Sequence, residues 1–325
     1  MTNEPRFRIL ANELPKRITV WLSLSWFVAA LLFPASADAC INVYGTSLSG
    51  QIHMKGVTHV RKPRPIDREF YLKQVQALTK SLTESPNFQD VSDLAVAHLY
   101  LGEVDRAISL LKKAEELQAG EYIIAANLGT AYELAGRNQD ALNWIQEGIR
   151  RNPDAHLGSE WVHVNLLRAK INMATDANWL TNHAASGVDF GRADMPQYSA
   201  ADSAENCPQS PGAVQAHLLY QLNERRQFIP GPDPVVADLM FDLANATAQT
   251  RTLEEAIPIY YIAQELGFHD RQLLDRRISK LKELRRYNLL SNWSLESLIF
   301  AGVSTVVVAI FLLVKAVTRR GTSHV

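Results

Sequence analysis

Apolar residues in the middle of the chain recur with a helical period, in segments separated by short polar turns. Between residues 88 and 155 they return at intervals of three and four positions, which places them on one face of a helix. Gly102 and Gly136 interrupt the pattern and supply the permissive backbone that a turn between two helices needs. Pro153 ends the last segment, because proline cannot continue a helix. The pattern predicts an all-α region built of helix pairs.

Two consecutive segments of this region share one pattern. Residues 88–121 align with residues 122–155 without a gap, and matched positions are 34 residues apart. Small residues at matched positions let the two helices of a pair approach closely, and larger apolar residues fill the space between helices. The matched positions include Leu94 and Leu128, Ala95 and Gly129, Gly102 and Gly136, Ala107 and Ala141, and Leu111 and Ile145.

The residues at these positions resemble the tetratricopeptide repeat family, whose period is 34 residues. The resemblance rests on Asn127-Leu128-Gly129, Tyr132, Gly136, Ala141 and Pro153. It implies a helix-turn-helix solenoid in which the first helix of each pair lines a concave groove that binds a protein or peptide. Some family members grip a C-terminal carboxylate with lysines and asparagines, but only Asn127 matches that clamp, so this mode is not predicted. The predicted groove residues, by family register, are Val96, Leu99, Tyr100, Ile123, Asn127, Thr130, Glu133, Val164 and Arg168.

A third unit and an insertion are predicted downstream. Residues 237–270 fit the repeat frame, although Arg251 replaces the turn glycine. Residues 156–236 are expected to hold degenerate repeat helices around an irregular insertion at 176–212, which is rich in Asp, Gly, Ser, Asn and Pro. A long ordered loop is often functional. The alternative is a lid that packs its aromatic residues onto the array.

The first 39 residues have the features of a secretory signal peptide. Lys16 and Arg17 precede an uncharged apolar run over 18–33, and an Ala-x-Ala site ends at Ala39. We therefore expect a signal peptide at 1–39, with an uncleaved signal anchor as the alternative, and an exported bacterial protein. Residues 40–87 are predicted to be an extension, with a small hairpin at 41–59 and a capping helix.

The C-terminal end is predicted to anchor the chain. Residues 294–317 form a largely uncharged apolar stretch that is long enough to cross a bilayer as one helix. The basic residues that follow indicate a short cytoplasmic tail at 318–325, so the main domain would be extracytoplasmic, or periplasmic in a bacterium. The basic segment 271–292 is predicted to be a helix that either caps the array or contacts anionic lipid headgroups.

Composition excludes several classes of protein. The 325 residues carry 33 Lys and Arg against 34 Asp and Glu, a balance that gives no reason to expect nucleic acid binding. With two cysteines, the chain is not a disulfide-rich scaffold. Cys40 and Cys207 would either form a disulfide in an oxidising compartment or leave Cys207 as a buried thiol. Lipid attachment at Cys40 is disfavoured, because Ala37 stands where a lipobox has leucine.

Catalytic, cofactor and metal motifs are not detected in the sequence. The first functional hypothesis is therefore a non-enzymatic, membrane-anchored scaffold that binds a protein or peptide in its groove. The second is an enzyme, or a subunit of an envelope enzyme complex, with its site in the insertion at 176–212. The third is a self-associating membrane protein.

Overall fold

The computed structural model describes residues 44–46, 48, 52–54, 60–63, 65–85, 87–204, 206–226, 228 and 231–321. From residue 290 on, the described side chains are those of 297, 299, 302, 304–306 and 310. All of these residues belong to one compact unit, Tyr44–Val325. The predicted signal segment at 1–39 and Cys40 lie outside the described residues.

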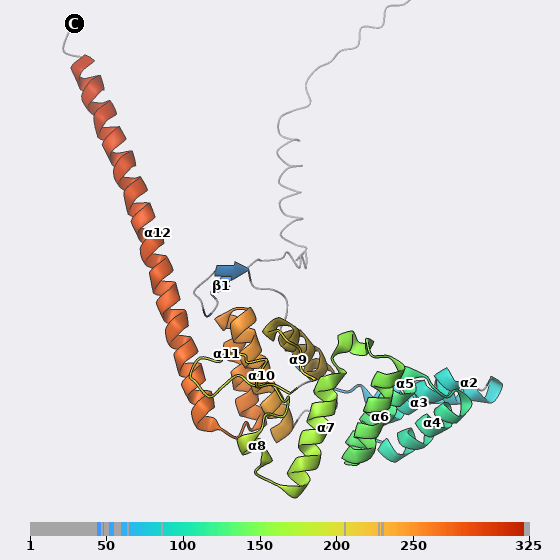
Figure 1. The fold of residues 1–325 in the computed structure, drawn as a ribbon. Helices are drawn as coiled ribbons and strands as arrows, with labels where there is room; N and C mark the ends of the chain where they lie inside the picture. The colour runs from blue at the N-terminus through green and yellow to red at the C-terminus, as the bar shows by residue number, and fades with distance from the viewer. Residues whose placement is uncertain are drawn as a thin grey trace, which may run out of the picture. The chain divides into compact units, whose positions relative to one another are not determined.

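Helices make up most of the regular structure in this part of the chain (Figure 1). In chain order they are α2 (Arg68–Glu84), α3 (Phe88–Leu101), α4 (Val104–Leu117), α5 (Tyr122–Leu134), α6 (Asn138–Arg151), the 3-10 turn η1 (Ala155–Gly158), α7 (Glu160–Thr175), α8 (Trp179–Asn182), α9 (Pro211–Arg225), α10 (Pro234–Thr250), α11 (Leu253–Leu266) and α12 (Arg271–Gly321). The strands β1 (Tyr44–Thr46) and β2 (Ile52–Met54) pair antiparallel and form the small hairpin that the sequence indicates.

Helices α3 to α6 form two pairs that repeat at the spacing seen in the sequence. Helix α3 begins after Asn87, whose side-chain oxygen accepts a hydrogen bond from the backbone N–H of Asp90 at 2.7 Å. This bond satisfies a donor at the helix end that has no partner within the helix. The helix ends at Gly102, whose φ of +82° favours glycine. Gly136 has a φ of +73° at the equivalent turn of the second pair. The helix pairs predicted for this region are therefore present, with α10 and α11 as a further pair.

Gly129 explains why a small residue is needed at this position of the second pair. A Cβ atom on Gly129 would lie 2.4 Å from Ile145 Cδ1 and 2.6 Å from Cγ1. Ile145 is buried, at 2% exposure, and has little room to move. The absence of a side chain at Gly129 thus sets how closely α5 and α6 approach.

Replacing Gly129 with alanine is expected to lower the free energy of unfolding by about 1–3 kcal/mol, because overpacking a full core forces side chains out of place. Gly148→Ala is the matched control: its Cβ would meet nothing closer than 3.7 Å, so the better helix propensity of alanine should stabilise the protein by up to about 1 kcal/mol. Urea denaturation of both variants checks this. In the double variant Gly129→Ala/Ile145→Val, the free energy of unfolding should fall by less than the sum of the decreases in the two single variants. Equal effects at both glycines would contradict the packing argument.

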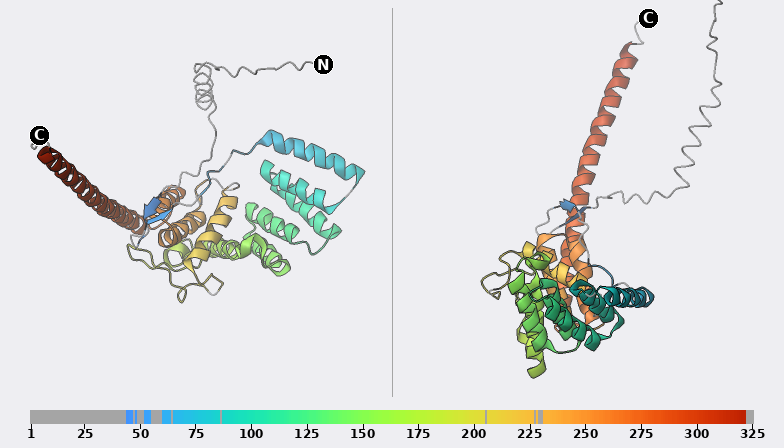
Figure 2. Two further views of the ribbon diagram at one scale, coloured as in Figure 1. Left: turned by 90° about the horizontal axis from the view of Figure 1, so that it is seen from above. Right: turned by 90° about the vertical axis from the view of Figure 1, so that its right-hand side faces the viewer.

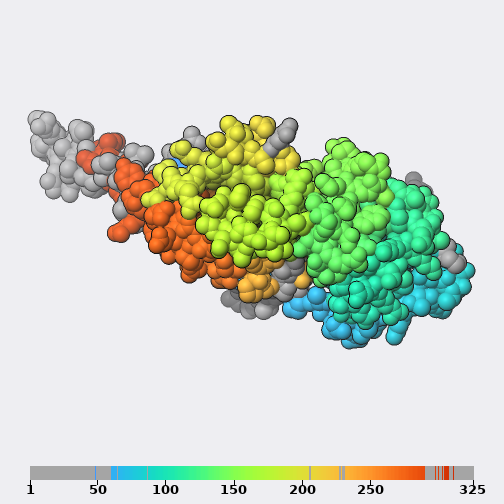
Figure 3. All heavy atoms as spheres, turned by 60° about the horizontal axis from the view of Figure 1, so that its bottom comes forward, coloured from blue at the N-terminus to red at the C-terminus, as the bar shows by residue number. Residues whose placement is uncertain are grey.

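The insertion between α7 and α9 is an ordered part of the fold. Arg277 of α12 is fully buried and donates hydrogen bonds to three backbone oxygens of the insertion. Its Nε donates to Ala193 O at 3.0 Å, and its Nη2 donates to Gly191 O at 2.6 Å and to Phe190 O at 3.2 Å. Phe190 is buried against the core. In Figure 3 the segment around the insertion (yellow-green) lies between the start of α12 (orange) and the repeat helices (green to cyan). These contacts are those of a lid packed onto the helices.

Helix α12 contains two segments that the sequence analysis treated as separate helices. The capping helix expected at 271–292 and the span expected at 294–317 lie in a single helix, Arg271–Gly321, because no proline interrupts the run (Figures 1 and 2). Its first turns pack against α11. Within the described part of the chain, no helix combines the length and the apolar character that crossing a membrane requires. The predicted transmembrane helix thus finds no support there, and most side chains of 294–317 lie outside the described residues.

Candidate functional site

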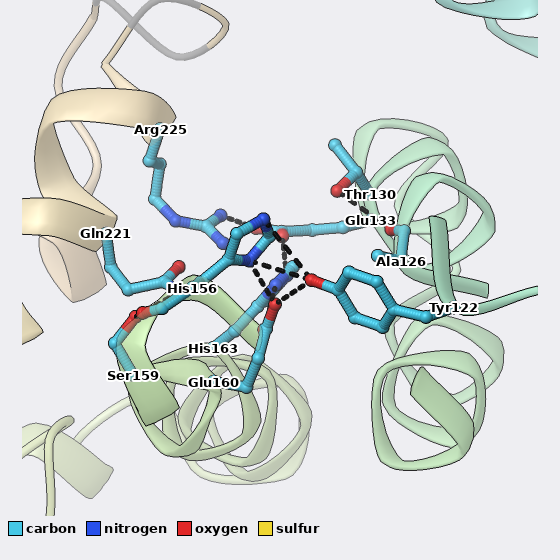
Figure 4. Close-up of polar contacts among 10 residues, drawn as sticks. All are labelled: Tyr122, Ala126, Thr130, Glu133, His156, Ser159, Glu160, His163, Gln221 and Arg225. Carbon is cyan, nitrogen blue, oxygen red and sulfur yellow. Dashed lines mark hydrogen bonds and ion pairs between the residues drawn. The ribbon is translucent and has the colours of Figure 1, made fainter. Parts of the chain in front are cut away.

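A small cavity lies where the second helix pair meets α7 and α9. Its volume is about 110 Å³. Helix α5 provides one wall and the η1 turn and α7 provide the second (Figure 4). Helix α9 provides the third wall together with Phe228, three residues beyond its end. The lining residues are Ala126, Asn127, Thr130, Glu133, Leu134, Ile145, His156, Glu160, His163, Tyr220, Gln221, Glu224, Arg225 and Phe228.

Glu133 holds the three walls together. Its carboxylate accepts a short hydrogen bond from Arg225 of α9, one from Lys170 Nζ of α7 at 2.9 Å, and one from His163 Nε2 at 2.8 Å. The Glu133 side chain is 2% exposed, and that of Arg225 is 9% exposed. Buried charges of this kind persist only when they are paired. The cluster therefore fixes α5 against α7 and α9.

Glu160 is the second buried carboxylate of the cavity. Its Oε1 accepts a hydrogen bond from His156 Nδ1 at 2.5 Å and one from the Tyr122 hydroxyl at 3.3 Å (Figure 4). Its Oε2 is buried and has no hydrogen-bond partner among the described residues; the nearest ion-pair atom is His163 Nδ1, at 3.7 Å. Glu160 is only 5% exposed, so this oxygen is a buried acceptor beside a cavity.

The η1 turn that positions His156 is strained. His156 has a φ of +51°, and Leu157, which follows it, has a φ of +61°. This left-handed region costs a residue with a side chain roughly 1–2 kcal/mol. Strain of this kind persists when surrounding contacts hold it and is concentrated at functional sites. Here the contacts are those of His156 with Glu160 and Tyr122.

Both carboxylates are ionised at neutral pH. Burial opposes ionisation of Glu133, but Arg225 and His163 hold its pKa well below the ordinary value. Burial also opposes ionisation of Glu160, yet the hydrogen bond from His156 lowers the pKa of this group to about 2. The same hydrogen bond raises the pKa of His156. Both carboxylates are therefore charged, and each is paired within or beside the cavity, Glu133 with Arg225 and Lys170 and Glu160 with His156.

The structure separates the nine predicted groove residues. Asn127, Thr130 and Glu133 line the cavity. Leu99 and Val164 are buried in the core, and Val96 is half-buried. Ile123 is 62% exposed and lies outside the cavity lining, and Arg168 lines a different cavity.

Tyr100, the remaining predicted groove residue, is covered by other parts of this chain. Its ring stacks on Tyr71 of α2 at 4.3 Å between centroids and packs against Phe228 at 4.7 Å. The backbone N–H of Arg61 donates to Asn223 Oδ1 of α9 at 2.8 Å, so the segment before α2 reaches α9 as well. This end of the groove is therefore occupied by the chain itself.

Sequence reasoning assigned Val164 and Arg168 of α7 to the groove, but it missed the residues of η1, α7 and α9 that line this cavity. His156, Glu160 and His163 are four and three residues apart, a spacing that would share one face of a continuous helix, and this spacing was the available signal. In the structure His156 instead lies in the η1 turn before α7 and reaches Glu160 from there. Glu224 and Arg225 gave no signal, because they lie about 90 residues after Glu133 in the chain, and only the fold brings Arg225 into contact with Glu133 and Glu224 to the same cavity. Among the described residues, no group of His, Cys, Asp and Glu is arranged to hold a metal ion.

A larger cavity of about 740 Å³ lies under the insertion. Asp238 and Asp242 of α10 line it, and each accepts a hydrogen bond from the insertion, from Ala185 N at 2.6 Å and from Ser186 Oγ at 2.5 Å. Burial raises the pKa of Asp238 well above its ordinary value and that of Asp242 to about 7.

Cys207 lies beside this cavity as a buried thiol that forms no disulfide with a described residue. Burial raises its pKa to about 11, so the thiol is protonated and unreactive at neutral pH. Its second expected use, pairing with Cys40, involves a residue outside the described part of the chain.

Comparison with known proteins identifies the repeats. No curated protein matches the sequence. The crystal structure of MamA aligns with 61% of this chain and 90% of its own, at 15% identity and a TM-score of 0.33. The crystal structure of YrrB, a TPR protein with an unusual peptide-binding site, aligns with 62% of this chain and 96% of its own, at 15% identity and a TM-score of 0.31. The crystal structure of the P58(IPK) TPR domain aligns with 68% of this chain and 66% of its own, at 15% identity and a TM-score of 0.25. Residues 92–156 match the family model described as tetratricopeptide repeat. The match confirms, for residues 92–156, the resemblance to tetratricopeptide repeats seen in the sequence.

Proposed function

We propose that this protein is a non-enzymatic scaffold that binds a protein or peptide partner at the cavity between α5, α7 and α9. The observation that carries the proposal is that Asn127, Thr130 and Glu133, three groove residues assigned by repeat register, line one cavity. Stacked helix pairs offer an extended surface for a partner. The cavity adds a pocket where one partner side chain is anchored, as the central residues of interfaces are.

The test compares two arginine substitutions in the full chain. Thr130→Arg places a long cation at the cavity, and Ser109→Arg places the same side chain on the exposed surface of α4. After crosslinking in cells and affinity purification, a stoichiometric partner is expected with the natural chain and with Ser109→Arg, and at least a tenfold smaller yield with Thr130→Arg. Equal recovery from both variants would reject the cavity as the binding site.

We further propose that the scaffold is membrane-anchored, with its main domain on the extracytoplasmic side. The support is the apolar stretch at 294–317, the signal features at 1–39, and the exposure of Ile299, Val306 and Ile310, each more than half accessible. Carbonate extraction of membranes from the source cells tests the anchor: an anchored chain stays in the pellet. Protease added to sealed cells or spheroplasts should digest an extracytoplasmic domain.

A second candidate function is binding or chemistry in the cavity under the insertion. Its volume of about 740 Å³ lies in the range of small-molecule sites. A thermal-shift screen of small molecules with the purified chain tests it, and a compound that raises the melting temperature would favour this candidate. The third candidate, self-association, is tested by light scattering after size exclusion, in which a monomer would reject it.

A further inference from the structure

We propose that the cavity between α5, α7 and α9 receives the cationic end of a lysine side chain from the partner, with Glu160 Oε2 as its acceptor. This inference rests on the proposed function, because it names the chemistry by which the partner is recognised. It is carried by three separate features of the described residues: an acceptor without a hydrogen bond, the charge of the lining, and the size of the space.

The first feature is the acceptor itself. Glu160 Oε2 is buried, has no hydrogen-bond partner among the described residues and belongs to a residue that lines the cavity. Its companion Oε1 is engaged by His156 and Tyr122. A buried polar atom that makes no hydrogen bond costs free energy, and the cost is larger when the group is charged. A donor that enters the cavity recovers that cost.

The second feature is charge. Glu133, Glu160 and Glu224 line the cavity, and Arg225 is the single lysine or arginine among the lining residues. Arg225 already pairs with Glu133. Glu224 is exposed at the rim and makes no ion pair with any described residue. An entering ammonium therefore meets the exposed Glu224 carboxylate and then Glu160 Oε2, which lies 3.7 Å from His163 Nδ1 but accepts no hydrogen bond. An entering carboxylate would be repelled by both charges.

The third feature is size. An apolar cavity of about 150 Å³ holds a benzene molecule, so about 110 Å³ suits a slimmer group than an aromatic ring. The walls beside the carboxylates are apolar at Ala126, Leu134 and Phe228. A lysine side chain matches this combination, since its methylene stem packs on apolar surface while its charged end makes the polar contacts.

The test measures binding of peptides that differ at one position. Nine-residue fluorescein-labelled peptides carry lysine, norleucine or glutamate at the centre, flanked by equal mixtures of Ala, Leu, Ser, Asn and Gln. Anisotropy titrations use the full chain in detergent, the Glu160→Gln variant, and Glu116→Gln, which changes an exposed glutamate of α4, as the control. The lysine set should bind the natural chain and Glu116→Gln at least tenfold more tightly than the norleucine set, and Glu160→Gln should remove this preference.

Several outcomes would overturn the inference. Equal binding of lysine and norleucine sets to the natural chain would do so without any variant, so a failure of Glu160→Gln to fold does not block the test. A lysine preference that survives in Glu160→Gln would place the acceptor elsewhere. If peptides bind without a lysine preference but binding is lost in Thr130→Arg, the proposed function stands and the inference fails. If none of the sets binds, both fail.

Discussion

Replacing Glu133 with alanine is expected to lower the free energy of unfolding by about 3–5 kcal/mol. The carboxylate lies at the meeting point of Arg225, Lys170 and His163, and its removal leaves the buried Arg225 guanidinium without its counter-charge. Urea denaturation followed by circular dichroism measures the loss. Glu69→Ala is the control, because Glu69 pairs with Lys73 where both side chains are more than 70% exposed, and such pairs contribute about 0–1 kcal/mol. Similar losses in both variants would mean that the Glu133 cluster is solvated.

The same cluster makes stability depend on pH in a defined direction. Because the pKa of Glu133 is held well below its ordinary value of 4.5 in the folded protein, its contribution is present above that value and is lost as the pH falls toward the folded-state pKa. The difference in unfolding free energy between the natural chain and Glu133→Gln should therefore shrink between pH 7 and pH 3, since glutamine does not titrate. A difference that stays constant over this range would contradict the assigned charge state.

Replacing Arg277 with methionine is expected to cost a similar amount, about 3–5 kcal/mol, and to release the insertion. Methionine fills much of the volume but cannot donate to the oxygens of Ala193, Gly191 and Phe190 or to Asn245 Oδ1, which accepts from Arg277 Nη1 at 2.6 Å. The backbone oxygens of Ala193 and Gly191 would then lose this donor, whereas Phe190 O still accepts from Gln197 N at 3.1 Å and Asn245 Oδ1 from the Tyr260 hydroxyl at 2.5 Å. Urea denaturation measures the stability, and limited proteolysis should show faster cleavage within 176–210.

The neighbouring residue provides a matched control for this change. Arg276 pairs with Asp194 of the same insertion at 3.0 Å, but the two side chains are 49% and 52% exposed. Arg276→Met should therefore change stability by less than about 1 kcal/mol and leave the proteolysis pattern unchanged. If Arg276→Met exposed the insertion as much as Arg277→Met, burial of the guanidinium would not be the reason that the insertion is ordered.

The two cavities differ in how their polar groups are used. Under the insertion, Asp238 and Asp242 accept hydrogen bonds from the Ala185 N–H and the Ser186 hydroxyl, and Arg277 donates to backbone oxygens of the insertion, so these side chains hold it in place. In the cavity of α5, α7 and α9, Glu133 has the corresponding structural role, whereas Glu160 keeps one oxygen without a hydrogen bond. This difference is why the smaller cavity, and not the larger one, carries the proposal of a recognition site.

Much of the repeat architecture was determined by local features of the sequence. The 34-residue spacing, the turn glycines Gly102 and Gly136 and the small residue Gly129 each act within one helix pair, where residues close in the chain are also close in space. The hairpin at 41–59 was likewise readable from alternation. Periodicity could not show that 271–317 forms one helix, because a change from basic to apolar composition does not by itself end a helix.

The candidate site depended on tertiary structure. Repeat register placed Asn127, Thr130 and Glu133 on one face of α5, the face that lines the cavity, since that face follows from helical geometry alone. It could not show that the chain covers Tyr100 with its own Tyr71 and Phe228, nor that Arg225 reaches Glu133 across 92 residues of sequence. The contacts of Tyr100 with Phe228 and of Glu133 with Arg225 join segments on either side of an irregular insertion, and no periodic pattern extends through it. Sequence periodicity therefore determined the helix pairs, and only the packing of α7 and α9 against them decided which charges meet.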